Sequence, residues 1–308
     1  MPRMESSNLE VFLRAATPRL PWRSASMDCF QGGPSSVWQL DREKNKDAAV
    51  EYFAVADLWE HYAESSAYGL PVPVRSLSGT VVTQHLVPYL SAVQIYTASR
   101  PNSSLGVSRS TGSETDSWSN ESGAGERSSW DAASDDDDDD DDSAFKDAVS
   151  TKQRGYLNFQ YGEWDSPYDR VPLSQKVLEL AQEYPCLMSL TSAELSPSSW
   201  MSVAWYPTYQ IPAHRNIKEI SARFLTYHSI SSVFQDNIHH SGPECDDVKI
   251  AALSPFGLAT YRMKGDLWRR PGSTDSRRLS ELHWAASSWL KQVGAHHPDF
   301  AFFTSHHR

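Results

Sequence analysis

The chain has 308 residues, of which 39 are acidic and 28 basic, and its formal net charge at pH 7 is −11. Its three cysteines stand far apart with no CxxC spacing, which argues against a disulfide framework or a zinc cluster and favours a reducing compartment. The chain has neither an apolar signal-peptide core nor the ~20 apolar residues of a membrane span, so we expect an intracellular protein, cytoplasmic or nuclear, with organelle import left open by the arginines and serines near its start.

The first third of the chain predicts helices and one buried strand. Apolar residues recur at helical spacing in two stretches, and a third stretch is apolar and β-branched enough for a strand. The predicted elements are, in chain order, a helix from Asn8 to Ala16 ended by Pro18, a loop over residues 24–47, a helix from Val55 to Tyr62 closed by Gly69 and Pro71, and a strand from Tyr89 to Tyr96.

An acidic segment follows from Ser99 to Ser150. It holds fourteen acidic and four basic residues, a net charge of −10, so the other 256 residues are nearly neutral at −1. Eight successive aspartates, Asp135 to Asp142, repel one another and bury no apolar area. We therefore expect an unfolded, solvated insert whose two ends leave the folded body close together.

The rest of the chain predicts more strands than helices. Pro207 lies within the clearest strand and argues for an edge position or a bulge there. The predicted elements are a strand from Tyr156 to Tyr161, a helix from Leu173 to Tyr184, a strand from Met201 to Ile211, strands from Ala222 to Ile230 and from Phe256 to Met263 joined by a polar loop at residues 235–247, and a helix capped by Ser276 and ended by Gly294.

This order of elements indicates an α+β fold with an antiparallel or mixed sheet and helices packed on one face of it. Roughly 220 residues remain for the folded body, which suits one core. We expect a single domain in two parts, residues 8–98 and 151–303, interrupted by a long disordered acidic insert at residues 99–150. Residues 1–7 and 304–308 are expected to be disordered termini.

Eight separated blocks of sequence point to a known family. They are Asn8-Leu-Glu-Val-Phe-Leu13, Ser66-Ala-Tyr-Gly69, Val87-Pro-Tyr-Leu-Ser-Ala-Val-Gln-Ile-Tyr96, Ser166-Pro-Tyr168, Leu195-Ser-Pro-Ser-Ser-Trp200, Val203-Ala-Trp-Tyr-Pro207, Phe224-Leu-Thr-Tyr-His228 and His297-Pro-Asp-Phe300. In this order they resemble the plant family catalogued as domain of unknown function 789, over about residues 8–303. The resemblance implies a plant origin and a single family domain. It implies no activity, cofactor or catalytic residue.

The sequence contains no motif that names a reaction. GxSxG, GxGxxG, GxxxxGK[ST], HExxH and calcium-loop patterns are all absent. We therefore assign no catalytic, cofactor-binding or metal-ligating residue and expect no cofactor. Alternation in the densest aromatic block places Tyr206 on one face of the strand, and it places on the opposite, core face Val203, Trp205, Tyr209 and Ile211. Tyr206 is the predicted ligand contact there, and His228 is the second candidate.

The acidic insert predicts contact with a basic protein partner through salt-sensitive attraction, and it disfavours nucleic acid, whose phosphates carry the same sign. The contacts would come from Asp135, Asp136, Asp137, Asp138, Asp139, Asp140, Asp141 and Asp142. Ser113, Ser128 and Ser134 each have an aspartate three positions later, a setting that acid-directed kinases prefer. An inert spacer is the alternative interpretation, and the sequence does not predict an oligomeric state.

Two functional hypotheses follow. The leading one is a non-enzymatic interaction or regulatory domain whose acidic insert contacts basic partners, because catalytic motifs are missing and charge is concentrated in one segment. The other is an enzyme of unfamiliar type with a pocket near the aromatic sheet. A compact pocket lined by His228, Tyr206 or Asp236 would favour the second hypothesis, and a filled core would count against it.

Overall fold

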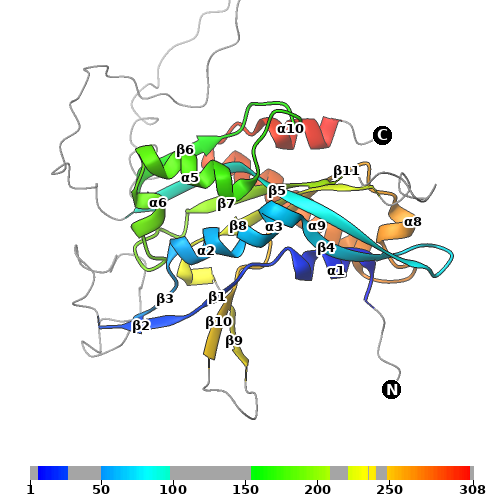
Figure 1. Ribbon diagram of the computed structural model, residues 1–308, viewed down its shortest axis with the longest axis horizontal. Coiled ribbons are helices and arrows are strands. Elements are labelled where there is room, and N and C mark those ends of the chain that lie inside the picture. The colour runs from blue at the N-terminus through cyan, green and yellow to red at the C-terminus, as the bar shows by residue number, and fades with distance from the viewer. Residues whose placement is uncertain are drawn as a thin grey trace, which may run out of the picture.

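The computed structural model describes residues 6–26, 50–97, 154–208, 221–234, 236–240 and 248–305 (Figure 1). Its centre is a six-stranded antiparallel sheet in the order β11-β8-β7-β5-β4, with β6 also paired to β5. The strands are β4 (Leu70–Arg75), β5 (Val81–Thr97), β6 (Tyr156–Gly162), β7 (Trp200–Pro207), β8 (Arg223–Ser229) and β11 (Gly257–Tyr261). The α+β class with an antiparallel sheet is confirmed.

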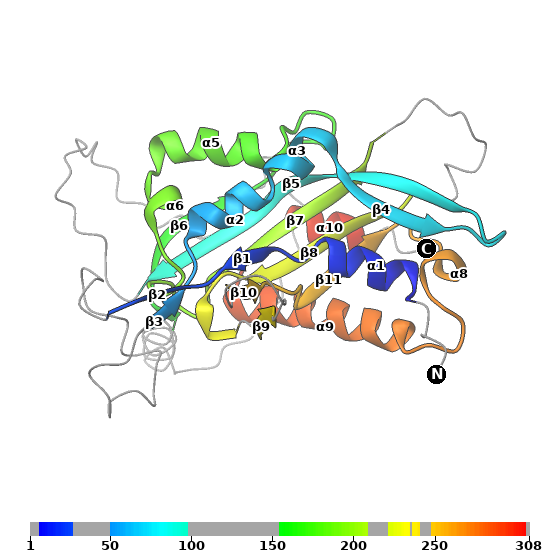
Figure 2. The same ribbon diagram turned by 60° about the horizontal axis from the view of Figure 1, so that its bottom comes forward.

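The long strand β5 connects the two parts of the chain (Figure 2). Its first residues pair with β4, its last residues pair with β6, and its opposite edge pairs with β7. The strand is 17 residues long, which exceeds the predicted Tyr89 to Tyr96 segment at both ends. The chain before residue 98 and the chain after residue 153 therefore contribute to one sheet.

Helices cover both faces of this sheet, so the expectation of one covered face is wrong. In Figure 1, α2 and α3 lie in front of the sheet and α9 lies behind it. The first face carries α1 (Asn8–Ala15), α2 (Val55–His61), α3 (Ala63–Tyr68), α5 (Leu173–Glu183), α6 (Cys186–Ser189) and α8 (Gly265–Trp268). The second face carries α9 (Asp275–Val293) and α10 (Pro298–Ser305). A Cβ atom at Gly257 would lie 2.9 Å from Cβ of Ala286, so glycine allows α9 to approach β11 closely.

Short strands complete the fold. A three-stranded sheet has the order β1-β10-β9, and β2 pairs with β3. These strands are β1 (Arg19–Pro21), β2 (Arg23–Ala25), β3 (Val50–Tyr52), β9 (Asp236–His240) and β10 (Val248–Ala252), and a 3-10 helix spans Ser232–Phe234. The prediction of a polar loop over residues 235–247 is wrong for residues 236–240, because they form β9, whose backbone pairs with β10.

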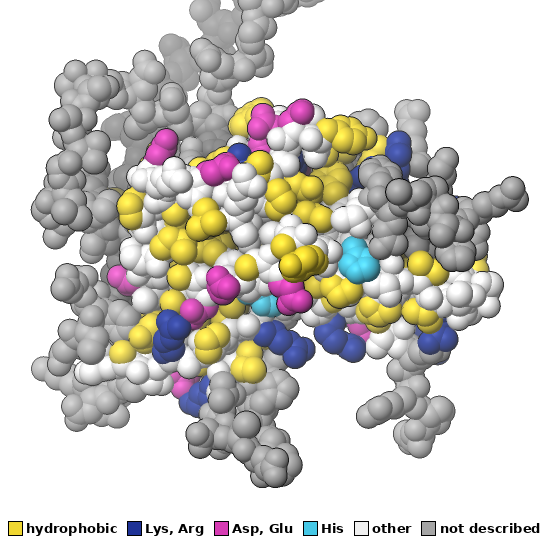
Figure 3. Space-filling view, in the orientation of Figure 1, with side chains coloured by type: hydrophobic (Ala, Val, Ile, Leu, Met, Phe, Trp, Pro, Cys, Tyr) yellow, Lys and Arg dark blue, Asp and Glu magenta, His cyan; other side chains and the backbone are white. Residues whose placement is uncertain are grey.

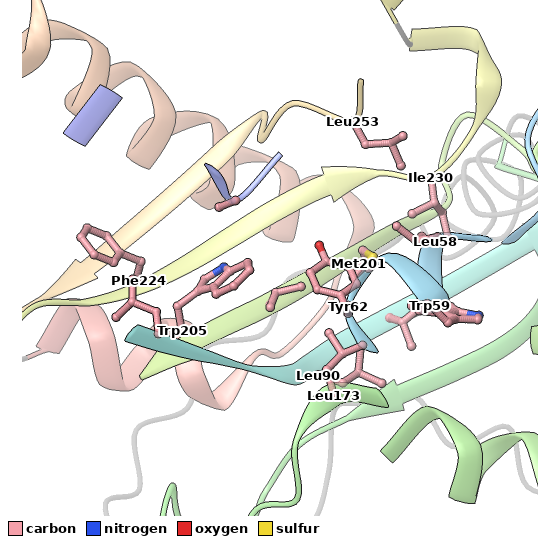
Figure 4. Packing of buried hydrophobic residues seen from close by; sticks show 14 of the residues in the cluster. Leu58, Trp59, Tyr62, Leu90, Leu173, Met201, Trp205, Phe224, Ile230 and Leu253 are labelled. Carbon is pink, nitrogen blue, oxygen red and sulfur yellow. The ribbon is translucent and has the colours of Figure 1, made fainter. Parts of the chain in front are cut away.

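The first face of the sheet holds the larger core, part of which appears in Figure 4. Phe12 of α1 stacks on Phe224 of β8 at 3.9 Å between ring centroids. Trp205 is 1% exposed, and its Nε1 donates a hydrogen bond of 3.0 Å to Oγ1 of Thr226. The predicted burial of Val203 and Trp205 is confirmed. Tyr209 and Ile211, predicted to share their face, lie outside the described residues.

Two of the predicted element boundaries differ from the structure, and a third agrees with it. Pro207 ends β7 rather than lying within it, and Thr274 rather than Ser276 precedes α9. Gly294 ends α9 with a φ of 66°, as predicted, because the left-handed conformation costs glycine least. Among the described helices, none is long and apolar enough to span a bilayer.

Candidate functional site

A pocket of about 610 Å³ lies on the second face of the sheet, beside α10. This volume falls within the range of ~300–1,000 Å³ that is common for small-molecule sites. The walls come from the middle of β5, from the ends of β7, β8 and β11, from the segment between β6 and α5, and from α10. The lining residues are Val87, Tyr89, Ser166, Pro167, Tyr168, Tyr206, Pro207, Thr208, Arg223, Tyr261, Arg262 and Phe302.

The alternation of side chains along β7 accounts for the aromatic wall of the pocket. Successive side chains of β7 point to opposite faces, so Trp205 enters the first core while Tyr206 faces α10. Tyr206 meets Tyr89 of β5 edge to face, with ring centroids 5.8 Å apart and an interplanar angle of 80°. The hydroxyl of Tyr206 is enclosed and forms no hydrogen bond with any described residue, and burial raises its pKa, which nearby Asp299 raises further.

Two arginines stand at the rim around Tyr261. The guanidinium carbon of Arg223 lies 5.2 Å from the centroid of the Tyr261 ring and 5.8 Å from that of Tyr206. The guanidinium carbon of Arg262 also lies 5.2 Å from the Tyr261 centroid. These distances suit cation–π contacts, which hold both guanidinium groups at the same ring. The pocket therefore combines an aromatic wall with positive charge at its rim.

Arg262 also has an unusual backbone. Its φ is 55°, and it is the one non-glycine residue in the described chain with a positive φ. A side chain in this left-handed region costs roughly 1–2 kcal/mol, and such residues cluster at binding sites and turns. Arg262 forms no ion pair with a described residue. Its charge is thus left beside the pocket.

A chain of buried polar groups lies behind the pocket. Arg170 donates hydrogen bonds of 2.7 and 2.8 Å to the two carboxylate oxygens of Asp299. The hydroxyl of Ser91 donates to Oδ2 of Asp299 at 2.5 Å and lies 2.8 Å from Nε2 of His297. The hydroxyl of Tyr227 lies 2.7 Å from Nδ1 of His297. The chain ties β5, β8 and the segment before α5 to the start of α10.

The direction of these hydrogen bonds fixes the proton on His297. Because a carboxylate only accepts, the Ser91 proton goes to Asp299, and Ser91 must then accept from Nε2–H of His297. Burial lowers the pKa of His297 to about 4, so its imidazole is neutral near pH 7. With the proton on Nε2, Nδ1 accepts a hydrogen bond from the hydroxyl of Tyr227.

A β-bulge brings Ser91 to this position. The register between β5 and β7 shifts between Leu90 and Ala92, so Ser91 is the extra residue on its strand. Ser91, His297 and Asp299 nevertheless do not form a catalytic triad. Asp299 contacts the serine rather than the histidine, and all three side chains are buried and absent from the pocket lining. The trio therefore supports the wall behind the pocket.

The family described as "Protein of unknown function (DUF789)" matches residues 7–303. The chain belongs to the DUF789 family. No curated protein and no solved structure is detectably similar to it. The DUF789 match includes every residue that lines the pocket and every member of the buried polar chain.

In this DUF789 domain the two predicted ligand contacts lie in different places. Tyr206 lines the pocket, whereas His228 is fully buried in the opposite core. Nδ1 of His228 donates to the carbonyl of Leu253 at 2.8 Å, Nε2 lies 2.9 Å from Oγ1 of Thr226, and burial lowers the pKa of His228 to about 4. His228 therefore packs in the core and does not line the pocket.

The remaining predicted sites cannot be placed. Asp135 to Asp142 and the serines Ser113, Ser128 and Ser134 lie outside the described residues. Among the residues that are described, no three His, Cys, Asp or Glu side chains gather where they could hold a metal ion. Sequence reasoning missed Arg223, Arg262 and the buried polar chain, although His297-Pro298-Asp299 stood within one of the family blocks.

Proposed function

We propose that this DUF789 protein is a non-enzymatic binding domain that holds a small organic molecule in the pocket lined by Tyr206 and Tyr261. The observation that carries this proposal is the pocket itself, which has a ligand-sized volume and a mainly apolar, aromatic lining with a few polar groups. Strands β5, β7, β8 and β11 supply much of that lining. Sites built on a packed sheet keep their shape, which favours selective binding.

The composition of the lining favours binding over catalysis. None of the twelve described residues that line the pocket is Asp, Glu, His, Lys or Cys. General acid–base chemistry most often uses such groups, and the Ser, Thr and Tyr hydroxyls of the lining would need an adjacent base of this kind to become effective nucleophiles. The alternative hypothesis, an enzyme of unfamiliar type with a pocket near the aromatic sheet, is supported by the position of the pocket and opposed by this lining.

A dye that fluoresces in apolar surroundings tests the proposal. N-phenyl-1-naphthylamine is uncharged and aromatic, and we expect it to bind the protein with saturable fluorescence. Val87→Trp would place an indole ring in the pocket, whose lining includes Val87, so we expect it to abolish this signal. Val81→Trp is the matched control, because Val81 lies on the same strand, is 54% exposed and does not line the pocket. Equal binding by both variants would refute the proposed function.

We further propose that the acidic insert contacts a basic protein partner. The support is its composition, a net charge of −10 within residues 99–150, with eight of the acidic groups in one run. On the face of the molecule in Figure 3, most Lys and Arg side chains lie in the lower half, with Asp and Glu side chains close to them, so the charge of the described surface there is mixed in sign. Phosphorylation at Ser113, Ser128 or Ser134 would strengthen the attraction, since each phosphate adds ~1.5–2 negative charges.

Substitution of the aspartate run tests the role of the insert. Replacing Asp135 to Asp142 with serine removes eight of the ten net negative charges and keeps the length of the segment. Binding to a basic partner such as a histone should then weaken sharply at low salt, and its dependence on salt should flatten. Unchanged affinity for the basic partner at low salt would indicate that the insert is a spacer.

A further inference from the structure

We infer that a second cavity of the protein binds a phosphate group. This cavity has a volume of about 190 Å³ and lies between α1, β1, the segment from β10 to β11 and the first half of α9 (Figure 2). Sites for small organic molecules commonly measure ~300–1,000 Å³, so this smaller cavity suits a single compact group. It shares no lining residue with the pocket at Tyr206, and the inference is independent of the proposed function.

The lining of this cavity carries an excess of positive charge. Three arginines, Arg14, Arg19 and Arg278, belong to it together with one acidic residue, Glu10, which gives a formal charge of +2. The 256 residues outside the acidic insert have a net charge of −1, so the excess is local. Charges of one sign along a cleft raise the concentration of the opposite ion within it. The cavity therefore favours anions.

Two of the three arginines are available to a ligand. Arg14 pairs with Glu10 of the same helix at 3.6 Å. Arg19 and Arg278 form no ion pair with a described residue. Arg278 also attracts the carboxylate of Asp275, but Asp275 lies outside the lining and already accepts a hydrogen bond from a backbone N–H. An anion in the cavity thus meets positive charge that no carboxylate of the lining has neutralised.

The pairing of β1 with β10 holds one wall of the cavity in place. Arg19 lies opposite Ala252 in the antiparallel ladder, and the backbone N–H of Leu253 donates to the carbonyl of Pro18 at 2.9 Å. The next residue, Ser254, lines the cavity, and its hydroxyl forms no hydrogen bond with a described residue. This hydroxyl is a further donor for an anion, placed on a backbone that the strands fix.

The donors of the lining favour phosphate among the anions. The planar N–H groups of arginine match the geometry of phosphate oxygens. A phosphate group carries about −1.5 to −2 charge at pH 7, so it gains more from this lining than a carboxylate with a single charge. Inorganic phosphate and a phosphate monoester share this chemistry, and the experiment that follows distinguishes them.

Thermal unfolding measures phosphate binding, because a ligand of the folded state raises Tm with its concentration. We expect inorganic phosphate at pH 7.5 to raise the Tm of the wild-type protein in a saturable manner, beyond the effect of sodium chloride at equal ionic strength. The concentration series gives an apparent Kd. A second series with glycerol 3-phosphate separates the two sources: a similar Kd indicates a phosphate monoester, and binding of inorganic phosphate alone indicates the free ion.

Two neighbouring arginines of α9 provide a matched pair of variants. Arg278→Gln should weaken phosphate binding about threefold, as the loss of one exposed charge pair allows. Arg277→Gln should leave the affinity unchanged, because Arg277 does not line the cavity and pairs with Glu281. Glu10→Gln should instead tighten binding, since Glu10 is the one acidic residue of the described lining.

Three results would overturn the inference. The first is a Tm of the wild-type protein that shows no saturable rise in phosphate beyond the effect of chloride. The second is equal weakening by Arg277→Gln and Arg278→Gln, which would show that phosphate responds to the net charge of the protein. The third is an affinity that Arg278→Gln leaves unchanged. Each of these leaves the proposed function standing, because N-phenyl-1-naphthylamine tests the other pocket.

Discussion

Arg170 and Asp299 form a two-pronged ion pair that links the segment before α5 to the start of α10. Their side chains are only 4% and 6% exposed, and the two N–H···O contacts measure 2.7 and 2.8 Å. The segment with Arg170 also supplies Pro167 and Tyr168 to the pocket, and α10 supplies Phe302. The pair therefore holds two walls of the pocket against each other.

Removing either partner of this pair should destabilise the protein strongly. We expect Arg170→Met and Asp299→Asn each to lower the free energy of unfolding by ~3–5 kcal/mol, because the remaining charge stays buried without its partner. Urea denaturation measures both changes. The double variant should lose less than the sum of the two single variants. Additive losses would show that the two side chains do not interact.

The exposed pair between Arg277 and Glu281 provides a control for this prediction. Its side chains are 83% and 59% exposed on α9, so solvent screens their attraction. Arg277→Met should leave the urea midpoint nearly unchanged. A shift as large as that of Arg170→Met would indicate that charge removal in general, rather than burial of the pair, causes the loss.

Because two histidines are buried, we expect the free energy of unfolding to fall as the pH is lowered from 6.5 towards 4. Burial lowers the folded-state pKa of His228 and of His297 to about 4, whereas the model-compound value is 6.5. Between these values the unfolded chain binds more protons than the folded one, so protonation favours unfolding. Each histidine should contribute up to ~1.4 kcal/mol of lost stability per pH unit in that window.

Urea denaturation at pH 7, 6 and 5 measures this dependence. His297→Gln removes one titrating group and keeps a side chain that both donates and accepts hydrogen bonds, so the slope should become shallower even if the variant is less stable at pH 7. Stability of the wild-type protein that is constant from pH 7 to pH 5 would contradict the prediction.

The backbone of Arg262 predicts a difference between two small replacements. At a φ of 55° alanine retains the steric cost of the left-handed region, and glycine does not. Glycine also gives the unfolded chain more freedom, which offsets part of the gain. We therefore expect Arg262→Gly to be more stable than Arg262→Ala by roughly 0.5–1 kcal/mol in thermal unfolding. The reverse order would show that the backbone relaxes after substitution.

The core around Trp205 provides a test of the assigned strand faces. Trp205 is 1% exposed, whereas Trp284 on α9 is 71% exposed. Truncation of Trp205 to alanine should cost ~3–5 kcal/mol, because it leaves a cavity and removes the partner of Thr226. Trp284→Ala should have little effect on the unfolding midpoint. If both variants changed the unfolding midpoint by similar small amounts, the assignment of Trp205 to the buried face of β7 would be wrong.

Local patterns in the sequence predicted several elements well. The stripe of apolar residues at helical spacing located α5, and Gly294 correctly marked the end of α9. Strand β4 was missed because Pro71 resembles a helix stop, yet Pro71 and Pro73 sit at exposed positions of a strand at the sheet edge, where a missing N–H is tolerated. Helix α10 was missed because its apolar residues follow no single face.

The candidate site was less predictable because its parts are distant in sequence. Alternation along β7 was enough to separate Tyr206 from Trp205. Ser91 and Asp299, however, are 208 residues apart, and a bulge in β5 brings them into contact. The pocket likewise joins Arg223, Tyr261 and Phe302 from three elements. The spacing of residues within one segment does not predict such a convergence, because the convergence depends on the order of the strands in the sheet and on which face each helix covers.

The most direct test of the binding site is a crystal structure of the protein with N-phenyl-1-naphthylamine. We predict that the naphthalene ring lies against Tyr206 and Phe302, which both line the pocket. A dye bound outside this pocket would contradict the account.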